Sequence, residues 1–312
     1  ECNNNQLEEL NINGLKYLEH LFCNNNKLKE LDLSELINLS NLDCSKNQIK
    51  NLDLKDLVNL EKLYLCHNQM EKIDLNNLDK INTLFCNNNL LKEINLIGLI
   101  NLKYINCSSN QLEDLNLKDN TGLETLDCSK NEIKELNLEN LLNLVRLSCK
   151  NNNLSSINVK NNINLVELFC ENNNLNSIDL KNNTKLNKLF CENNRISSID
   201  LKNNTDLRKL SISPQRIKLY RDIKNDYYEI DLSTLSILDK TKILFSSEQE
   251  GYSYDRDKEI IQIDKNLGVV GTCEYIYMFP KNTLINYIGP IDNLVVSIDW
   301  SVPELLKEDG WK

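Results

Sequence analysis

One asparagine returns every 21 residues along the first 200 positions of the chain, and the interval never changes. The positions are Asn5, Asn26, Asn47, Asn68, Asn89, Asn110, Asn131, Asn152, Asn173 and Asn194. An internal period of roughly 20–50 residues is typical of a repeat architecture, in which each unit packs only on its neighbours. Residues 1–212 are therefore expected to form a solenoid.

A cysteine stands three positions before nearly every one of these asparagines. The nine that keep the register are Cys2, Cys23, Cys44, Cys86, Cys107, Cys128, Cys149, Cys170 and Cys191. In the fourth repeat Leu65 takes this position, and Cys66 is displaced by one residue. The remaining cysteine, Cys273, lies outside the repeats.

Apolar residues complete the repeating unit. Leucine or isoleucine stands two residues before each cysteine position, from Leu21 to Leu210, and an apolar residue stands five after it, from Leu7 to Ile196. Each unit reads L-x-x-L-x-C-x-x-N-x-L-x-x-L-x-L. This pattern predicts a short strand around L-x-C, with leucine and cysteine facing inward and the strands stacked as a parallel sheet. The asparagine amide should bond backbone groups that the following turn leaves unpaired.

These residues resemble leucine-rich repeats, whose strand-and-turn signature is L-x-x-L-x-L-x-x-N/C-x-L. Because cysteine takes the last leucine position of that signature, residues 1 to about 212 are similar to the cysteine-ladder internalins and related bacterial surface proteins. The resemblance implies a right-handed solenoid with a parallel β-sheet on the concave face and a mostly irregular or extended convex arc. The chain contains no alanine, the best helix former, which also disfavours long helices.

The ladder cysteines are interpreted as small buried hydrophobes. In-register side chains should lie about 4.8 Å apart, whereas a disulfide needs Cβ atoms about 3.8 Å apart. A linear column also does not converge on a zinc ion. Cys66 and His67 could form a nucleophile and base, but neighbours on a strand rarely orient correctly, and no third group accompanies them. We therefore expect no enzymatic activity, no metal and no cofactor.

A second polar column lies on the opposite arc, at Asn11, Asp32, Asp53, Asp74, Asn95, Asn116, Asn137, Asn158, Asp179 and Asp200. Each residue is flanked by apolar neighbours, so its side chain should point outward and start the next bend through an Asx-type bond. Calcium bound along Asp32, Asp53 and Asp74 is the alternative, because stacked carboxylates repel one another.

The outward residues of the sheet are the candidate ligand-binding residues. They carry rings that cluster along the concave face, and both histidines of the chain map to the same surface. The predicted ligand-binding residues are Phe22, Tyr64, Phe85, Tyr104, Phe169, Phe190, His20 and His67. Aromatic anchors within a polar border are typical of an interface. The alternative is that the rings only shield the sheet by stacking on one another.

The net charge of −10 and the pI near 5.0 argue against a nucleic-acid partner. The predicted function is non-enzymatic recognition or adhesion, with a protein ligand on the concave face; the resemblance implies a host surface protein. One alternative is a glycan ligand on the same face. The other is a structural envelope protein without a specific ligand. The sequence leaves the oligomeric state open.

The resemblance also implies a protein that is secreted or attached to the surface of a bacterium. No transmembrane segment is evident, since no run approaches the roughly 20 apolar residues of a membrane span. The chain begins inside a repeat at Glu1, without a signal peptide or an N-terminal cap, so we expect an excised fragment. Free thiols would equally suit an intracellular scaffold in a reducing compartment.

Residues 213–300 differ sharply in composition from the repeats. Of the 53 asparagines 48 precede residue 213, whereas eight of the 11 tyrosines follow it. The strand-like segments are 216–220, 228–232, 242–245, 260–263, 272–279 and 294–300. Short strands separated by turn residues predict an all-β sandwich, and its position resembles the immunoglobulin-like domain after internalin repeats. It should cap the sheet edge and act as a spacer, and residues 301–312 should form a tail.

Overall fold

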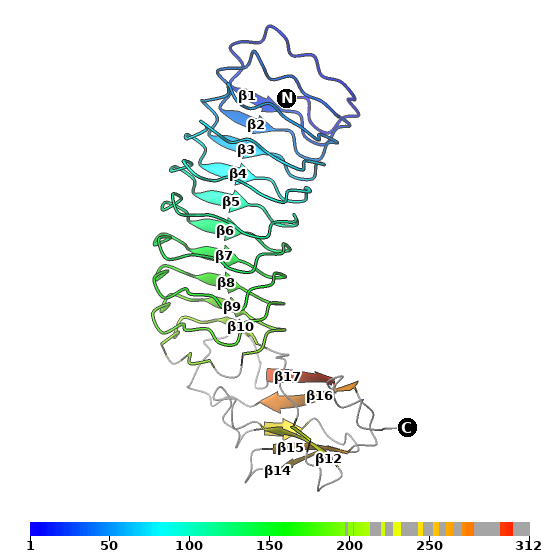
Figure 1. Cartoon of the computed structure of the whole chain (residues 1–312), viewed down its shortest axis with the longest axis vertical. Coiled ribbons are helices and arrows are strands. Elements are labelled where there is room, and N and C mark those ends of the chain that lie inside the picture. Colours follow the sequence, from blue (N-terminus) through cyan, green and yellow to red (C-terminus); the bar gives the residue numbers. More distant parts are fainter. Residues whose placement is uncertain are drawn as a thin grey trace.

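The computed structural model describes residues 1–196, 199–201 and 203–212 in full, and seven strand segments between residues 220 and 301 as backbone. Residues 1–212 form a stack of similar turns, with β1 near one end and β10 at the other (Figure 1). This is the solenoid that the 21-residue period predicts.

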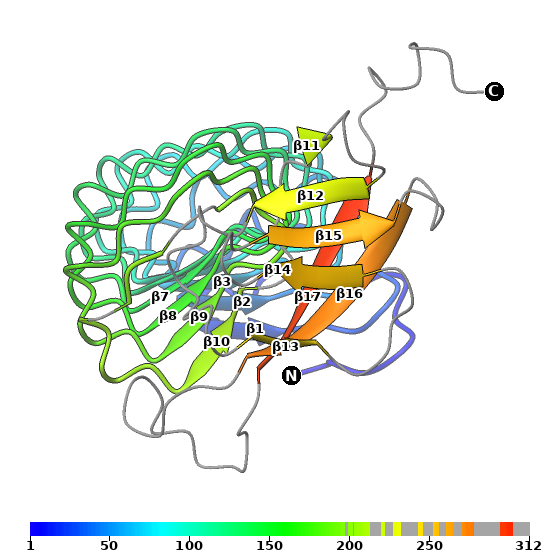
Figure 2. The same ribbon diagram turned by 90° about the horizontal axis from the view of Figure 1, so that it is seen from below.

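Ten three-residue strands line one side of the solenoid in a single parallel sheet whose order is the order of the sequence. Their bounds are β1 His20–Phe22, β2 Asn41–Asp43, β3 Lys62–Tyr64, β4 Thr83–Phe85, β5 Tyr104–Asn106, β6 Thr125–Asp127, β7 Arg146–Ser148, β8 Glu167–Phe169, β9 Lys188–Phe190 and β10 Lys209–Ser211. Leu21 pairs with Leu42, and Leu168 pairs with Leu189, so the register equals the period. Seen along the stack, the strands gather on one side of the coil and irregular chain closes the other (Figure 2).

The apolar columns fill the interior of the coil. The middle residue of each of β1–β9 is buried, and Leu42, Leu63 and Leu84 have no exposed surface. Fully burying one leucine side chain contributes about 1.5–3 kcal/mol. Each repeat has several such side chains, but it can bury them only against the repeats on either side. The repeats therefore depend on one another for stability, and the stack is cooperative.

The ladder asparagines join each repeat to the one before it, as predicted. The Asn131 Nδ2 donates to the backbone oxygens of Cys107 and Cys128, at 3.1 Å each. Its Oδ1 accepts the Leu112 backbone N–H at 3.0 Å. The same contacts recur at Asn47 and Asn152. One amide therefore satisfies buried backbone groups of two consecutive turns, which explains why the residue never varies.

The outer polar column makes the predicted Asx bonds. Asp32 Oδ1 accepts the backbone N–H of Ser34 at 3.0 Å, and Asn137 Oδ1 accepts that of Glu139 at 3.0 Å. This backbone bond holds the pKa of Asp32 below its ordinary value. Asparagine and aspartate serve equally because only the oxygen is used.

Two further asparagine positions were not anticipated. Asn38 is exposed and Asn59 is half-buried, and they donate to the backbone oxygens of Lys16 and Ile37 in the preceding repeat. A buried column holds leucine in most of the first repeats and asparagine in most of the last, with the amides at Asn120, Asn162, Asn183 and Asn204, each 0% exposed. The Nδ2 atoms of these four residues donate to backbone oxygens, but their Oδ1 atoms have no partner among the described residues.

The ladder cysteines face the interior. Eight of the ten described cysteines are buried, the other two are half-buried, and all ten are free thiols. Burial raises the pKa of Cys107 to about 12, because the thiolate would lose its hydration inside the coil. The cysteines therefore serve as packing residues, as the repeat pattern predicts.

The described strands after residue 212 form two antiparallel sheets. One has the order β11-β12-β15-β14, with β11 Tyr220–Arg221, β12 Tyr227–Asp231, β14 Tyr252–Asp255 and β15 Ile260–Asp264. The other has the order β13-β16-β17, with β13 Ile243–Phe245, β16 Val270–Tyr277 and β17 Leu294–Ser301. The predicted segments overlap each of these strands except β14; the first segment, 216–220, shares only Tyr220 with β11, because residues 216–219 lie outside the described residues. The tail from residue 302 onward and the Cys273 side chain lie outside them too.

Candidate ligand-binding face

The outward side chains of β1–β10, with the residue two positions after each strand, form what we call the sheet face. In β1–β9 the middle residue is buried, and in most strands the first and third residues are exposed or half-buried, as along β1 and β8. Because strands pair in register, residues 21 apart become neighbours on this face. The face therefore consists of columns of side chains that cross the strands.

At the N-terminal end of the face, His20 and Phe22 lie on the same strand. Their ring centroids are 6.4 Å apart and the planes differ by 22°. The His20 Nδ1 lies 3.3 Å from the Ser40 hydroxyl. Phe22 is half-buried and His20 is exposed, so both predicted residues are on the predicted surface.

Tyr64 and Phe85 form the next aromatic pair, from the adjacent strands β3 and β4. The centroids lie 5.4 Å apart with the rings edge to face at 86°. Such pairs contribute about 0.5–1.5 kcal/mol beyond their burial. Burial of the phenol raises the pKa of Tyr64. The alternative that the rings shield the sheet by packing on one another therefore holds in part, because this pair covers its part of the sheet.

Tyr104 is on the sheet face but belongs to a polar contact. Its side chain is 38% exposed, and its hydroxyl donates to Glu124 Oε2 at 2.8 Å. That hydrogen bond raises the pKa of Tyr104. Within the described part of the chain, Tyr104 makes no ring contact with Phe85, so the predicted grouping of Tyr104 with Tyr64 and Phe85 reduces to a pair.

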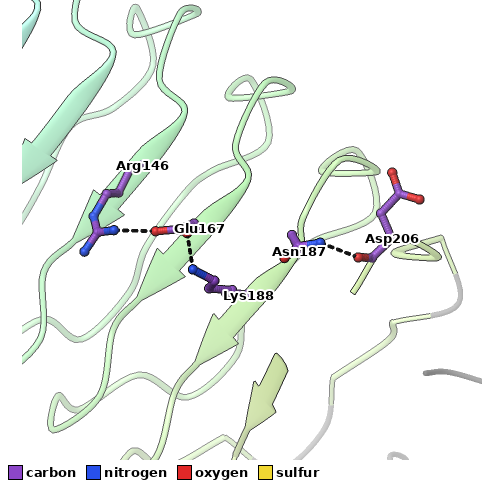
Figure 3. Close-up of polar contacts among 5 residues, drawn as sticks. All are labelled: Arg146, Glu167, Asn187, Lys188 and Asp206. Carbon is purple, nitrogen blue, oxygen red and sulfur yellow. Dashed lines mark hydrogen bonds and ion pairs between the residues drawn. The ribbon is translucent and has the colours of Figure 1, made fainter. Parts of the chain in front are cut away.

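Phe169 and Phe190 form the C-terminal aromatic pair, from β8 and β9. Their centroids are 5.3 Å apart with 30° between the planes, and the Arg146 guanidinium lies 4.9 Å from the Phe169 centroid. Arg146 and Lys188 both form ion pairs with Glu167, which stands between them on the sheet (Figure 3). These three charged residues lie one column away from the rings, so the rings have a charged border.

Polar residues separate the two aromatic pairs. Asp127 accepts the Ser129 backbone N–H at 3.0 Å and its hydroxyl at 2.6 Å, and Asn106 holds Ser108 in the same way. Ser148, expected to point outward, is only 3% exposed, because a short side chain there sinks between larger neighbours. The sheet face thus has an aromatic pair on either side of a polar middle.

Cys66 and His67 contact different groups. The Cys66 Sγ is 3.5 Å from the Phe85 backbone oxygen, and burial raises the pKa of the thiol. His67 takes the left-handed turn position at φ 55°, where asparagine stands in several other repeats. Its Nε2 lies 3.4 Å from the Asn88 Nδ2. The one-residue displacement of Cys66 leaves its thiol half-buried against the next repeat.

The described residues include neither a membrane-spanning helix nor a cluster of metal ligands. None of their helices is long and apolar enough to cross a membrane. None of their clusters combines three or more histidine, cysteine or acidic side chains in a way that could hold a metal ion.

Comparison with solved structures finds this fold in several proteins. The functional domain of InlJ from Listeria monocytogenes, which includes a cysteine ladder, aligns over 93% of this chain and 88% of its own, with a TM-score of 0.56 and 19% identity. YopM from Yersinia enterocolitica aligns over 68% of this chain and 50% of its own, with a TM-score of 0.55 and 26% identity. The plant peptide hormone receptor RGFR1, in complex with RGF2, aligns over 65% of this chain and 37% of its own, with a TM-score of 0.59 and 26% identity.

A scan against protein-family models finds no match, and a search of curated proteins finds none either. The fold and the repeat together define the class: the chain is a leucine-rich-repeat solenoid. Its 21-residue unit and inward cysteine column resemble the cysteine ladder of the InlJ functional domain, with which it shares the fold.

Proposed function

We propose that this chain is a non-enzymatic recognition protein that binds a protein ligand through its sheet face. The observation that carries the proposal is the pair of aromatic contacts, Tyr64 with Phe85 and Phe169 with Phe190, set in a polar surface. Half-buried rings on a rigid sheet offer contact area at little entropic cost, and aromatic residues with a polar border dominate binding energy at interfaces.

The comparisons support the class of function. RGFR1, one of the similar structures, is a plant peptide hormone receptor in complex with RGF2. A solenoid presents a wide surface whose side chains can change without disturbing the core. We extend the proposal to a secreted or surface-attached bacterial protein, on the resemblance to internalins. We also propose the domain division at residues 212 and 213, with an immunoglobulin-like sandwich formed by the two antiparallel sheets.

Affinity capture from surface-biotinylated animal cells tests the proposal. The native chain should retain a labelled protein that a five-ring variant loses, with Phe22, Tyr64, Phe85, Phe169 and Phe190 all changed to Ser. The matched control changes five exposed apolar residues of the arc to Ser: Ile37, Val58, Ile100, Leu142 and Ile163, which are 44–60% exposed. It should retain the same labelled protein. Equal capture by the native chain and the five-ring variant would contradict the proposal.

A glycan ligand is the second candidate, because stacked rings beside amide and carboxylate groups also suit sugar rings. A glycan array should then give specific signals that Phe85→Ala abolishes. If the native chain captures nothing and the five-ring substitution leaves cell adhesion unchanged, the protein is instead a structural envelope protein.

A further inference from the structure

The two aromatic pairs of the sheet face have different surroundings. Around Tyr64 and Phe85, the flanking positions are Lys62 and Thr83 on one side and Cys66 and Asn87 on the other. Around Phe169 and Phe190, every flanking position is charged. This contrast makes the C-terminal pair the more selective of the two surfaces.

The border at the start of the strands is basic. Arg146, Lys188 and Lys209 stand in register with Glu167, so three positive side chains accompany one negative side chain. Glu167 is 16% exposed and is already paired on both sides, whereas the Arg146 side chain is 49% exposed. This border can therefore still attract a carboxylate.

The border beyond the strand ends is acidic. Glu171 and Glu192 are 21 residues apart, two positions after Phe169 and Phe190, and Lys150 precedes them in the column. Six buried side-chain oxygens lack a hydrogen-bond partner within the described part of the chain; Glu171 Oε2 and Glu192 Oε2 are the two carboxylate members. Burial, together with the neighbouring Glu192, raises the pKa of Glu171 although Lys150 acts against it. One oxygen of each carboxylate, Oε2, therefore lacks a donor among the described residues, and a cationic side chain at this border would add donors to the carboxylate pair.

We infer that the C-terminal aromatic pair receives an apolar or aromatic side chain of a protein partner, flanked by a basic side chain on Glu171 and Glu192 and an acidic one toward Arg146 and Lys188. This partner chemistry rests on the proposed function. The two borders are four residues apart along each repeat, which corresponds to about 13 Å of extended chain. An extended partner segment with its charges four residues apart spans the same distance.

The borders also explain why a purely apolar partner fits less well. A neutral segment would cover Glu171 and Glu192 without supplying donors, and a buried charge left unpaired is costly. A partner segment with an acidic residue on both sides would place one of them beside Glu171 and would add repulsion there. Complementary charge therefore selects among apolar segments.

The test is a nuclear magnetic resonance titration of the full chain carrying ¹³C-labelled phenylalanine. The probe is the peptide Ac-Glu-Gly-Phe-Gly-Arg-NH₂, compared with peptides that carry Gln for Glu, citrulline for Arg, or both. We expect the parent peptide to shift the Phe169 and Phe190 resonances. Each neutral replacement should weaken binding about two- to fivefold, as for a partly exposed ion pair.

The isosteric variant Glu171→Gln/Glu192→Gln should abolish the preference for Arg over citrulline but keep the preference for Glu over Gln. The control Glu113→Gln/Glu135→Gln removes the same charge from exposed positions of the arc and should keep both preferences. Equal binding of the Arg and citrulline peptides, an Arg preference that survives in the Glu171→Gln/Glu192→Gln variant, or no shift of either resonance would overturn the inference.

The two proposals can fail separately. If the five-ring variant loses capture while the peptides show no charge preference, the sheet face binds a ligand of other chemistry. If the charge preference is present while capture is unaffected, the proposed function fails and the selectivity of this surface stands.

Discussion

The interior of the solenoid and its sheet face come from the same ten strands, yet they follow opposite rules. Inside, the middle strand residue is leucine or isoleucine in every repeat, and the asparagine of the turn never changes. Outside, the third strand residue changes from Phe22 to Asp43 to Tyr64 along the first three strands. An inward side chain must pack against the corresponding side chains of the repeats on both sides. An outward side chain contacts those neighbours only in part and is otherwise free to vary.

The difference separates architecture from recognition. Interior residues such as Asn131 satisfy backbone groups of neighbouring repeats, so their loss should affect folding first. Residues of the sheet face such as Phe169 contact one neighbouring ring and one guanidinium, so their loss should affect binding first. Four predictions test this separation, ordered from the largest expected effect to the smallest.

Raising the pH should weaken the interior most strongly. Burial raises the pKa of Cys23 and Cys107 from 9.0 to about 12. Both states keep the proton below pH 9, but the unfolded chain loses it between pH 9 and 12, so the free energy of unfolding falls with pH. Each such thiol contributes a loss of about 1.4 kcal/mol per pH unit.

The check is the urea midpoint of the reduced chain at pH 8 and at pH 10.5. Cys107→Val removes one titrating thiol and should make the decrease shallower. A midpoint that does not change with pH would show that the thiols are not buried in the folded chain.

Asn131→Ala should lower the free energy of unfolding by about 3 kcal/mol. The substitution leaves the buried Leu112 N–H without a partner, at about 1–3 kcal/mol for a buried group, and it removes one of the two amide bonds to each of the Cys107 and Cys128 oxygens, which keep those from Asn110 and Asn152. The matched change Asn137→Ala removes one exposed Asx bond and should have a much smaller effect. Urea unfolding of both variants measures the difference, and equal losses would contradict a structural role specific to the ladder.

Phe169→Ser/Phe190→Ser should cost about 1–2 kcal/mol, because it removes one ring pair and two half-buried surfaces. Peptide binding at these rings should be lost, while circular dichroism and the strand register stay native. If this double variant unfolds the chain, the rings belong to the architecture, and the separation between interior and sheet face fails.

Asn183→Leu should change the free energy of unfolding by no more than about 1 kcal/mol, although Asn183 is fully buried. Its Nδ2 donates to the Val159 and Asn162 oxygens, which also accept backbone N–H groups, and its Oδ1 has no partner in the described residues. Leucine stands at this position in other repeats, as Leu78 and Leu99 show. Differential scanning calorimetry would settle the sign, and a loss like that of Asn131→Ala would show that the amide is needed.

The regular part of this fold could be predicted because each interior residue occurs ten times. Repetition fixed the strand positions, the inward cysteines and the Asx column. The buried column of Asn162, Asn183 and Asn204 was missed because the same position is leucine in earlier repeats, so it has no single signature. The 21-residue spacing of those three could have revealed it. Strand β14, Tyr252–Asp255, was missed because YSYD is too polar to be recognised as a strand run.

The sheet face was predictable as a surface but less so in its contacts. Residues 21 apart in one column had to be neighbours, which gave the Tyr64–Phe85 and Phe169–Phe190 pairs. Contacts that cross columns depend on rotamers, so neither the Arg146 guanidinium over Phe169 nor the hydrogen bond from Tyr104 to Glu124 followed from spacing. The charged border lies in the columns on either side of the rings, so the aromatic column alone did not predict it.

The most direct test of the separation is a displayed library with every residue of β1–β10 varied, scored both for folded display and for binding to biotinylated cell-surface extract. The account predicts that substitutions at the middle positions, such as Leu147 and Leu168, remove display and binding together. Substitutions at Tyr64, Phe85, Phe169 and Phe190 should remove binding while display persists. The account is wrong if the substitutions that remove binding but keep display occur only at other positions. It is also wrong if substitutions at the four rings remove display.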